Sequence, residues 1–183
     1  MDNEKLRDEL QNYLGDIDDL FFFSLLTRKV KGKSGMQKLV LISVTSELPK
    51  RDYCGTYKMR DIGPSIRIHR YTHEDKHQYF ERFLSTLVHE SCHAYLDIFC
   101  DKRHSKHQEW VCDYDGHRKM FWVLFRFIMQ KIKAYTKPEA WGNQVKDMES
   151  ECFSITKRKS QPGEWGTPEC TLMGGFLSRE YSK

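Results

Sequence analysis

The run His89-Glu90-Ser91-Cys92-His93 places two histidines and a glutamate at the spacing of an H-E-x-x-H motif. Residues i and i+4 share one face of an α-helix, so the imidazoles of His89 and His93 can bind one Zn²⁺ ion together. Glu90 lies beside that face, where its carboxylate can take a proton from a zinc-bound water and return it to a leaving amine. The motif therefore indicates a zinc site that activates water for attack on a carbonyl group.

A simpler interpretation is that these are ordinary histidines of an amphipathic helix and that Glu90 is an unremarkable surface charge. Two observations favour metal binding. The motif lies in a segment whose apolar period independently predicts a helix, and His89 and His93 border the apolar stripe instead of the opposite polar face. Histidines at the border of the apolar stripe suit a metal site that is surrounded by core residues.

A catalytic zinc site needs a third protein ligand and an open position for water. The H-E-x-x-H-x-x-G-x-x-H extension is absent, because Leu96 stands at its glycine position and Phe99 at its third histidine. Glu109 lies in a polar loop and is a poor candidate. His117 is better placed, because it begins the next apolar helix and follows Gly116, which lets the backbone turn sharply. The other downstream candidates are His104, His107, Asp113 and Asp115.

Two short helices are predicted at the N-terminus. Apolar residues recur at helical spacing over residues 3–14, and Gly15 follows as a C-terminal stop. A second helix is expected from Asp18 or Asp19 to Leu26, because acidic residues favour a helix start. Both helices are expected to cover the core.

Three segments ahead of the motif predict a small β-sheet. Residues 39–44 form an apolar, β-branched run, which is typical of a largely buried strand. Residues 65–69 alternate between polar and apolar types, as in a strand with one buried face. A further strand is expected over residues 53–57, around Gly55.

A long helix is predicted to carry the motif. Thr72 and Asp75 resemble a capping box, and the apolar residues that follow hold a 3.6-residue period, so this helix is expected over residues 74–99. Residues 101–116 lack a clear period and are predicted to form a surface loop with room for a turn of helix. A helix that is apolar nearly all round follows over residues 117–135. The fold class is therefore predicted to be α+β, with a small sheet packed on helices.

Two segments of the chain together resemble the SprT-like zinc metalloprotease domain, the Spartan-like family. Residues 87–95 contain the H-E-x-x-H motif, and residues 116–121 are similar to the family's G-H-x-x-x-F segment, which bears its third ligand. Weaker similarity extends the match over roughly residues 17 to 135, through residues 20–26, 54–55 and 65–68.

The resemblance implies a zincin-like fold over residues 1–136, with the motif on the active-site helix. It implies that His89, His93 and His117 bind Zn²⁺ and that Glu90 is the general base of an endopeptidase. Proteins attached to DNA are the implied substrate class, including those removed in DNA–protein crosslink repair. The strand containing Ile66 is expected to be an edge strand that holds the substrate backbone by strand addition.

The chain departs from the family pattern in two places. The stretch between His93 and Gly116 is longer than usual, which leaves room for His104 or His107 to act as a ligand. The zinc-ribbon cysteines that many relatives carry after the catalytic helices are missing, so the relatives' way of engaging DNA is not expected here.

A second hypothesis is a non-catalytic module for binding nucleic acid or protein, in which zinc only stabilises the fold. A closed structural site takes four protein ligands, so a fourth ligand from Cys112, His104 or His107 would favour it. Glu90 argues for the peptidase, because a structural site has no use for a general base.

Composition places the chain in a broad class. Its 183 residues are expected to form one catalytic domain, and no stretch approaches the roughly 20 apolar residues of a membrane span. The polar residues 1–5 and the apolar cluster at residues 20–26 lack the features of a signal peptide, so an intracellular protein, nuclear or cytoplasmic and not secreted, is expected.

The net charge of +4 permits contact with nucleic acid without requiring it. Basic residues gather over residues 28–38 and at 157–159, and with the family resemblance they predict weak, sequence-independent DNA binding. Residues 137–183 are punctuated by Gly and Pro and are expected to be a C-terminal extension packed on the same domain. Residues 151–155 and 169–172 are candidates for a hairpin within it.

Overall fold

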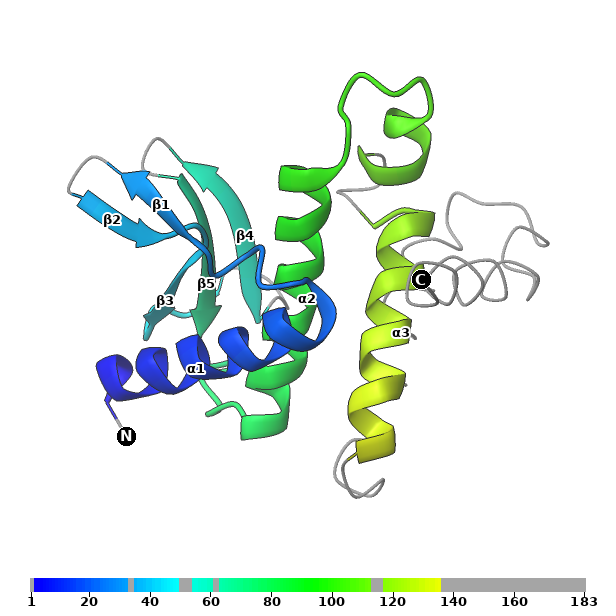
Figure 1. Cartoon of the computed structure of the whole chain (residues 1–183). Helices are drawn as coiled ribbons and strands as arrows, with labels where there is room; N and C mark the ends of the chain where they lie inside the picture. Colours follow the sequence, from blue (N-terminus) through cyan, green and yellow to red (C-terminus); the bar gives the residue numbers. More distant parts are fainter. Residues whose placement is uncertain (1, 33–34, 50–53, 61–62, 113–116, 136–183) are drawn as a thin grey trace, which may run out of the picture. The chain divides into compact units, whose positions relative to one another are not determined.

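The computed structural model describes residues 2–32, 35–49, 54–60, 63–112 and 117–135. All of them belong to the first of two compact units, Met1–Lys146, into which the chain divides. They form helices and small sheets in an α+β arrangement, as predicted (Figure 1). The extension at residues 137–183 and its predicted hairpin lie outside the described residues.

Helix α1 (Asn3–Phe21) is one continuous helix, so the predicted stop at Gly15 is wrong. The separate helix predicted from Asp18 or Asp19 to Leu26 is wrong as well, because α1 ends at Phe21 and the left-handed φ of 58° at Phe23 and Ser24 turns the chain out of the helix. The buried stripe of Leu10, Leu14 and Ile17 continues past the glycine, and its burial outweighs the cost of about 1 kcal/mol for glycine inside a helix. The last turn of the helix contains a buried carboxylate: Asp18 accepts hydrogen bonds from the backbone N–H groups of Leu26 and Thr27, at 3.0 and 2.7 Å.

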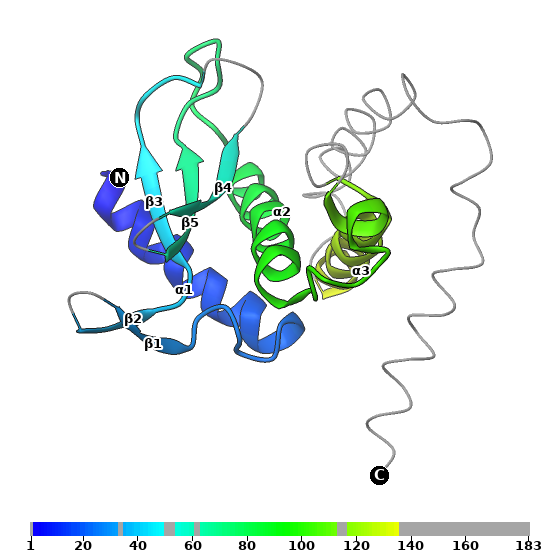
Figure 2. The ribbon, with the colours of Figure 1, turned by 90° about the horizontal axis from the view of Figure 1, so that it is seen from above.

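The main sheet has three strands in the order β3-β5-β4. β3 (Leu41–Thr45) pairs in parallel with β5 (Gly63–His69), and β4 (Gly55–Arg60) pairs with β5 in antiparallel fashion. The expectation that the strand containing Ile66 is an edge is therefore wrong, because β5 has a partner on both sides and its Ile66 is fully buried. β4 is the edge strand next to helix α2 (Figures 1 and 2).

A two-stranded hairpin of β1 (Lys29–Gly32) and β2 (Gly35–Lys38) precedes the main sheet and has no counterpart in the sequence prediction. Its strands have four residues each and bury no side chain fully, so they lack the apolar pattern by which strands are predicted. Lys29 lies directly opposite Lys38 in this hairpin.

Helix α2 (Phe80–Phe99) begins six positions later than its predicted start at residue 74. Thr72 and Asp75 form a tight turn in place of a capping box: the Asp75 N–H donates to the Thr72 carbonyl at 3.0 Å, and Asp75 has a left-handed φ of 58°. The helix contacts β4, β5, α1 and α3, so it is packed between the sheet and the other helices.

A connection with a π-helical segment, Gln108–Cys112, leads from α2 to helix α3 (Lys119–Tyr135). α3 packs on α2 through the fully buried rings of Phe121 and Phe125, which contact His89 of α2. Within the described part of the chain, none of the helices combines the length and apolar character that crossing a bilayer requires.

Candidate metal centre

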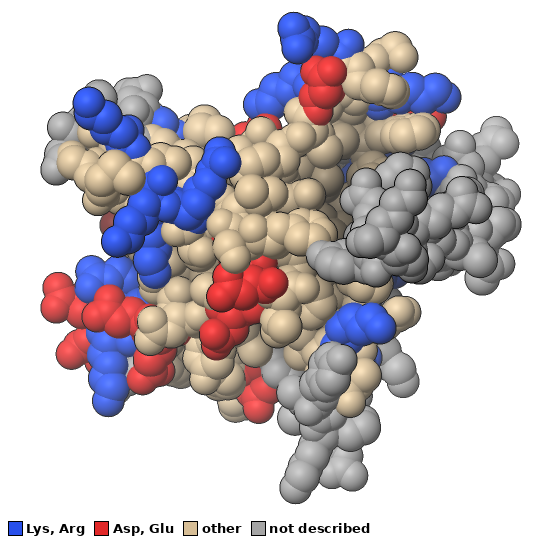
Figure 3. All heavy atoms as spheres, viewed as in Figure 1, with Lys and Arg blue, Asp and Glu red and all other residues tan. Residues whose placement is uncertain are grey.

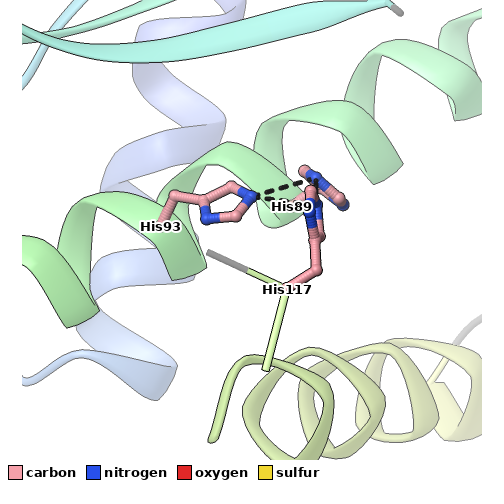
Figure 4. Close-up of side chains that lie close together, drawn as sticks. All are labelled: His89, His93 and His117. Atoms are coloured by element: carbon pink, nitrogen blue, oxygen red, sulfur yellow. Dashed lines mark hydrogen bonds between the residues drawn. The ribbon is translucent and has the colours of Figure 1, made fainter. Parts of the chain in front are cut away.

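Three imidazoles converge where the end of the connection meets helix α2 (Figure 4). His89 and His93 come from successive turns of α2, and His117 comes from the residues just before α3. The Nε2 atom of His93 lies 3.2 Å from that of His89 and 3.1 Å from that of His117, and the Nε2 atoms of His89 and His117 are 2.9 Å apart. The predicted set of ligands is thus brought together.

Hydrogen bonds alone cannot satisfy these three contacts. A nitrogen of a neutral imidazole is either an N–H donor or a lone-pair acceptor. Among three mutually close nitrogens, at least one pair must then place two donors or two acceptors against each other. Three lone pairs directed at one point suit a cation, and the three histidines are positioned to hold a metal ion.

The electrostatics of the site keep two of these side chains in the neutral form that binds metals. Burial lowers the pKa of His89 well below its ordinary value, and the nearby charges of His93 and His117 lower it further. Burial, followed by the charge of His117, lowers the pKa of His93 to about 3. Neither ring has to lose a proton at neutral pH before it can donate a lone pair to a metal.

Two aromatic side chains of α3 pack against the imidazole rings of the three histidines. The ring centroid of Phe121 lies 4.8, 4.3 and 4.8 Å from those of His89, His93 and His117, and it is stacked on His93. Trp122 stacks on the His117 ring, and its Nε1–H donates to the His117 backbone carbonyl at 3.0 Å. The sequence signal for this second contact was the place of Trp122 early in an apolar helix, five residues after His117.

Glu90 lies between α2 and the edge strand. A Cβ atom added to Gly55 of β4 would be 3.3 Å from Glu90 Cγ, which places the glutamate side chain against that strand. The side chain is buried, and burial raises the pKa of its carboxyl to about 8, although the backbone N–H of Tyr57 opposes this shift as a hydrogen-bond donor. A carboxyl whose pKa lies near neutrality is suited to accept and return a proton.

The alternative ligands do not join the three histidines. Among the described residues, the cluster able to hold a metal consists of His89, His93 and His117 alone. His104 lies in the connection, where its ring contacts Trp110 and its Nδ1 accepts from the Lys106 N–H at 3.1 Å. The remaining candidates are accounted for as follows: His107 is also outside the cluster, Glu109 lies 3.9 Å from the Lys106 ammonium, and Asp113, Asp115 and the Cys112 side chain lie outside the described residues.

One polar group beside the site was missed by sequence reasoning. The Tyr57 hydroxyl donates to Asp97 Oδ2 at 2.8 Å, which links β4 to helix α2 one turn beyond His93. The signal available in the sequence was the four-residue spacing from His93 to Asp97, which puts both side chains on one helix face.

Comparison of the chain with protein-family models, with curated proteins and with solved structures finds no match. The donor atoms and their surroundings therefore carry the functional argument.

Proposed function

We propose that the chain is a zinc-dependent endopeptidase of the SprT-like kind, built on a zincin-like fold. The observation that carries the proposal is the convergence of His89, His93 and His117 beside the middle of helix α2, which also bears Glu90. In this proposal the histidines bind Zn²⁺ and Glu90 is the general base.

The donor set fits zinc. Three neutral imidazoles suit Zn²⁺, whereas calcium and magnesium prefer oxygen ligands. Zinc–nitrogen bonds of 2.0–2.1 Å at tetrahedral angles separate the nitrogens by about 3.3 Å. The Nε2 separations of 2.9, 3.1 and 3.2 Å lie within a few tenths of an ångström of that value.

When bound, the metal supplies a Lewis acid that polarises a peptide carbonyl and acidifies water. Glu90 accepts the proton of the attacking water and delivers it to the nitrogen of the leaving amine, so that the peptide C–N bond breaks as the new C–O bond forms. Burial of Glu90 supports this role, because it strengthens the carboxylate as a base.

The free edge of β4 is the proposed docking strand for the substrate. β4 pairs with β5 on one side, and no described strand pairs with its other side. Its residue Tyr57 directs a backbone N–H at Glu90. An extended peptide added to this edge would therefore pass next to the general base.

DNA-associated proteins in the nucleus or cytoplasm are the proposed substrates, and weak DNA contact is the proposed means of reaching them. Lys and Arg side chains gather over the β1–β2 hairpin (Figure 3), and residues 20–46 contain no acidic residue. No ion pair of the described residues involves Lys29, Lys31 or Lys38. The second basic run, residues 157–159, lies outside the described residues.

A non-catalytic zinc module is the alternative, and it requires a fourth protein ligand. The described residues offer three ligands, which supports an open site.

The test is cleavage of an unstructured protein substrate by the zinc-loaded protein and by a Glu90→Gln variant. The amide keeps the shape of the side chain but cannot accept the proton, so cleavage should fall by at least about a hundredfold while zinc is retained. Equal cleavage by both proteins would remove Glu90 from the mechanism, and no cleavage by the wild type would favour the non-catalytic module.

A further inference from the structure

A carboxylate that metal binding does not use lies beside the metal centre. Asp97 Oδ2 accepts the hydroxyl proton of Tyr57 at 2.8 Å, and Asp97 Oδ1 accepts from the Lys102 ammonium at 2.6 Å. The Asp97 side chain keeps 33% of its surface exposed, so water and a ligand can both reach it. Its two oxygens have different partners, one fixed on the sheet and one on the connection after α2.

The place of this carboxylate relates it to the proposed substrate strand. Asp97 follows His93 by four residues, so it lies one turn further along the same face of α2. Tyr57 belongs to β4, where its backbone faces Glu90 and its hydroxyl reaches Asp97. Tyr57 of the edge strand thus contacts both Glu90, the proposed general base, and Asp97. Figures 1 and 2 both show β4 alongside α2.

The two partners of Asp97 differ in how firmly they are held. The Tyr57 side chain is half-buried between β4 and α2, and its bond orients the carboxylate. Lys102 is 58% exposed and follows the end of α2, so its ammonium is held mainly by this one contact. An exposed ion pair of this kind contributes little to stability and exchanges its partner easily.

We propose that Asp97, oriented by Tyr57, forms a subsite for a lysine or arginine side chain of a substrate strand added to the edge of β4. Lys102 occupies that subsite in the substrate-free protein and leaves it when a substrate cation binds. This inference rests on the proposed peptidase function and deepens it, because it names the chemical class of side chain that the site selects.

The chemistry requires only an exchange of cations. The Lys102 ammonium returns to water, and the substrate ammonium or guanidinium takes its hydrogen bond to Asp97 Oδ1. An ion pair at a partly exposed carboxylate favours the charged side chain over an apolar one of equal length by roughly two- to fivefold. A neutral substrate side chain does not displace Lys102 and forms no ion pair with Asp97.

The experiment uses the zinc-loaded full chain and a set of quenched fluorescent peptides that differ at one position, scanned along the peptide, as Lys, Arg, norleucine or Glu. The readout is the ratio of kcat/KM for the Lys peptide to that for the norleucine peptide. Because both rates come from one enzyme preparation, the ratio does not depend on the fraction of folded protein. Because the pair is partly exposed, the wild-type ratio at one scanned position should be roughly two to five.

Three variants test the assignment. Asp97→Asn should bring the ratio close to one, and Tyr57→Phe, which keeps the backbone N–H, should lower it in part. Lys102→Ala should raise it, because the internal competitor is gone. Lys76→Ala is the matched control: Lys76 also pairs with a carboxylate, that of Glu74, in the turn before α2, and its loss should leave the ratio unchanged.

Failure of the subsite and failure of the peptidase give different results. If the wild type cleaves Lys and norleucine peptides equally at every position, or if Asp97→Asn keeps the wild-type ratio, the subsite is overturned and the peptidase stands. If no peptide is cleaved, binding of the same peptides to the zinc-loaded Glu90→Gln protein is measured by fluorescence anisotropy. Equal affinity for Lys and norleucine peptides there overturns the subsite independently of catalysis, and a preference that Asp97→Asn abolishes supports it.

Discussion

Trp122 holds His117 at two points: its indole N–H donates to the His117 backbone carbonyl at 3.0 Å, and its ring lies stacked on the imidazole. Of the three candidate ligands, His117 alone does not come from α2, and the four residues before it lie outside the described part of the chain. The position of the third ligand therefore depends on a contact from α3.

Trp122→Phe keeps a ring for stacking but removes the hydrogen bond. We expect metal affinity to fall by about tenfold, the lower end of the range for groups that orient a ligand. Titration with a competing chelator measures this, with Trp110→Phe in the connection as the control. Equal affinity in the Trp122→Phe and control proteins would show that the stacking alone positions His117.

His117→Ala should lose the bound metal, because two histidines leave the centre with too few protein ligands. His104→Ala and His107→Ala should keep one metal ion per chain, since neither side chain belongs to the cluster. Elemental analysis of the three folded variants decides between them. Full metal content in His117→Ala would require another side chain to complete the site.

Two glycine substitutions should change stability in opposite directions. A Cβ on Gly55 would lie 2.6 Å from Thr86 Cγ2 and 3.1 Å from the Arg67 carbonyl oxygen, so Gly55→Ala pushes β4 away from α2. We expect a loss of about 1–3 kcal/mol in the free energy of unfolding. Gly15→Ala meets no atom within 4 Å inside a helix and should gain about 0.5–1 kcal/mol. Urea unfolding measures both, and a stabilised Gly55→Ala protein would contradict the close approach of β4 to the helix.

Glu90 should make the metal-free protein sensitive to pH. Burial raises the pKa of its carboxyl from 4.5 to about 8. The protonated form is thus favoured in the folded state, and its contribution to stability is full below pH 4.5 and lost as the pH rises to about 8.

Glu90→Gln does not titrate, so its stability relative to the wild type should increase over that pH range, by on the order of a few kcal/mol. Urea unfolding at pH 5 and pH 8 in the presence of a chelator tests this, with Glu109→Gln as the exposed control. If the free energies of unfolding of variant and wild type differ by the same amount at both pH values, Glu90 ionises in the folded protein as readily as in the unfolded one.

The β1–β2 hairpin should provide the contact with DNA. Each lost phosphate contact flattens the slope of log affinity against log salt by about one unit. Changing Lys29, Lys31 and Lys38 to Ala should therefore flatten it by up to about three units. A control protein with Lys5, Lys76 and Lys131 changed to Ala has the same net charge. If the two triple variants show the same slope, the hairpin is not the binding surface.

The convergence of the three histidines was predictable in part from local patterns. His89 and His93 are joined by one helical turn, and the position of His117 after a glycine and before an apolar helix favoured it over the other downstream candidates. The spacing from His93 places Asp97 on the same helix face, but its bond from Tyr57 spans 40 residues, so no local pattern indicated that partner.

The parts of the fold that were predicted wrongly also depend on features that a local sequence pattern does not show. The four-residue strands of the β1–β2 hairpin have too few buried side chains to show a period. The capping-box pattern at Thr72 and Asp75 also suits a tight turn, and tertiary context selected the turn. In α1, burial of the apolar stripe outweighed the local preference of Gly15.

The edge of β4 that no described strand pairs also bears on self-association. A strand open to an extended peptide is equally open to the same strand of another copy, and such edges nucleate aggregation. Lys58 and Arg60 are exposed near the end of β4 and place like charges against each other whenever two copies approach edge to edge. These two side chains therefore act as gatekeepers: they disfavour self-association while the rest of the edge stays available to other chains.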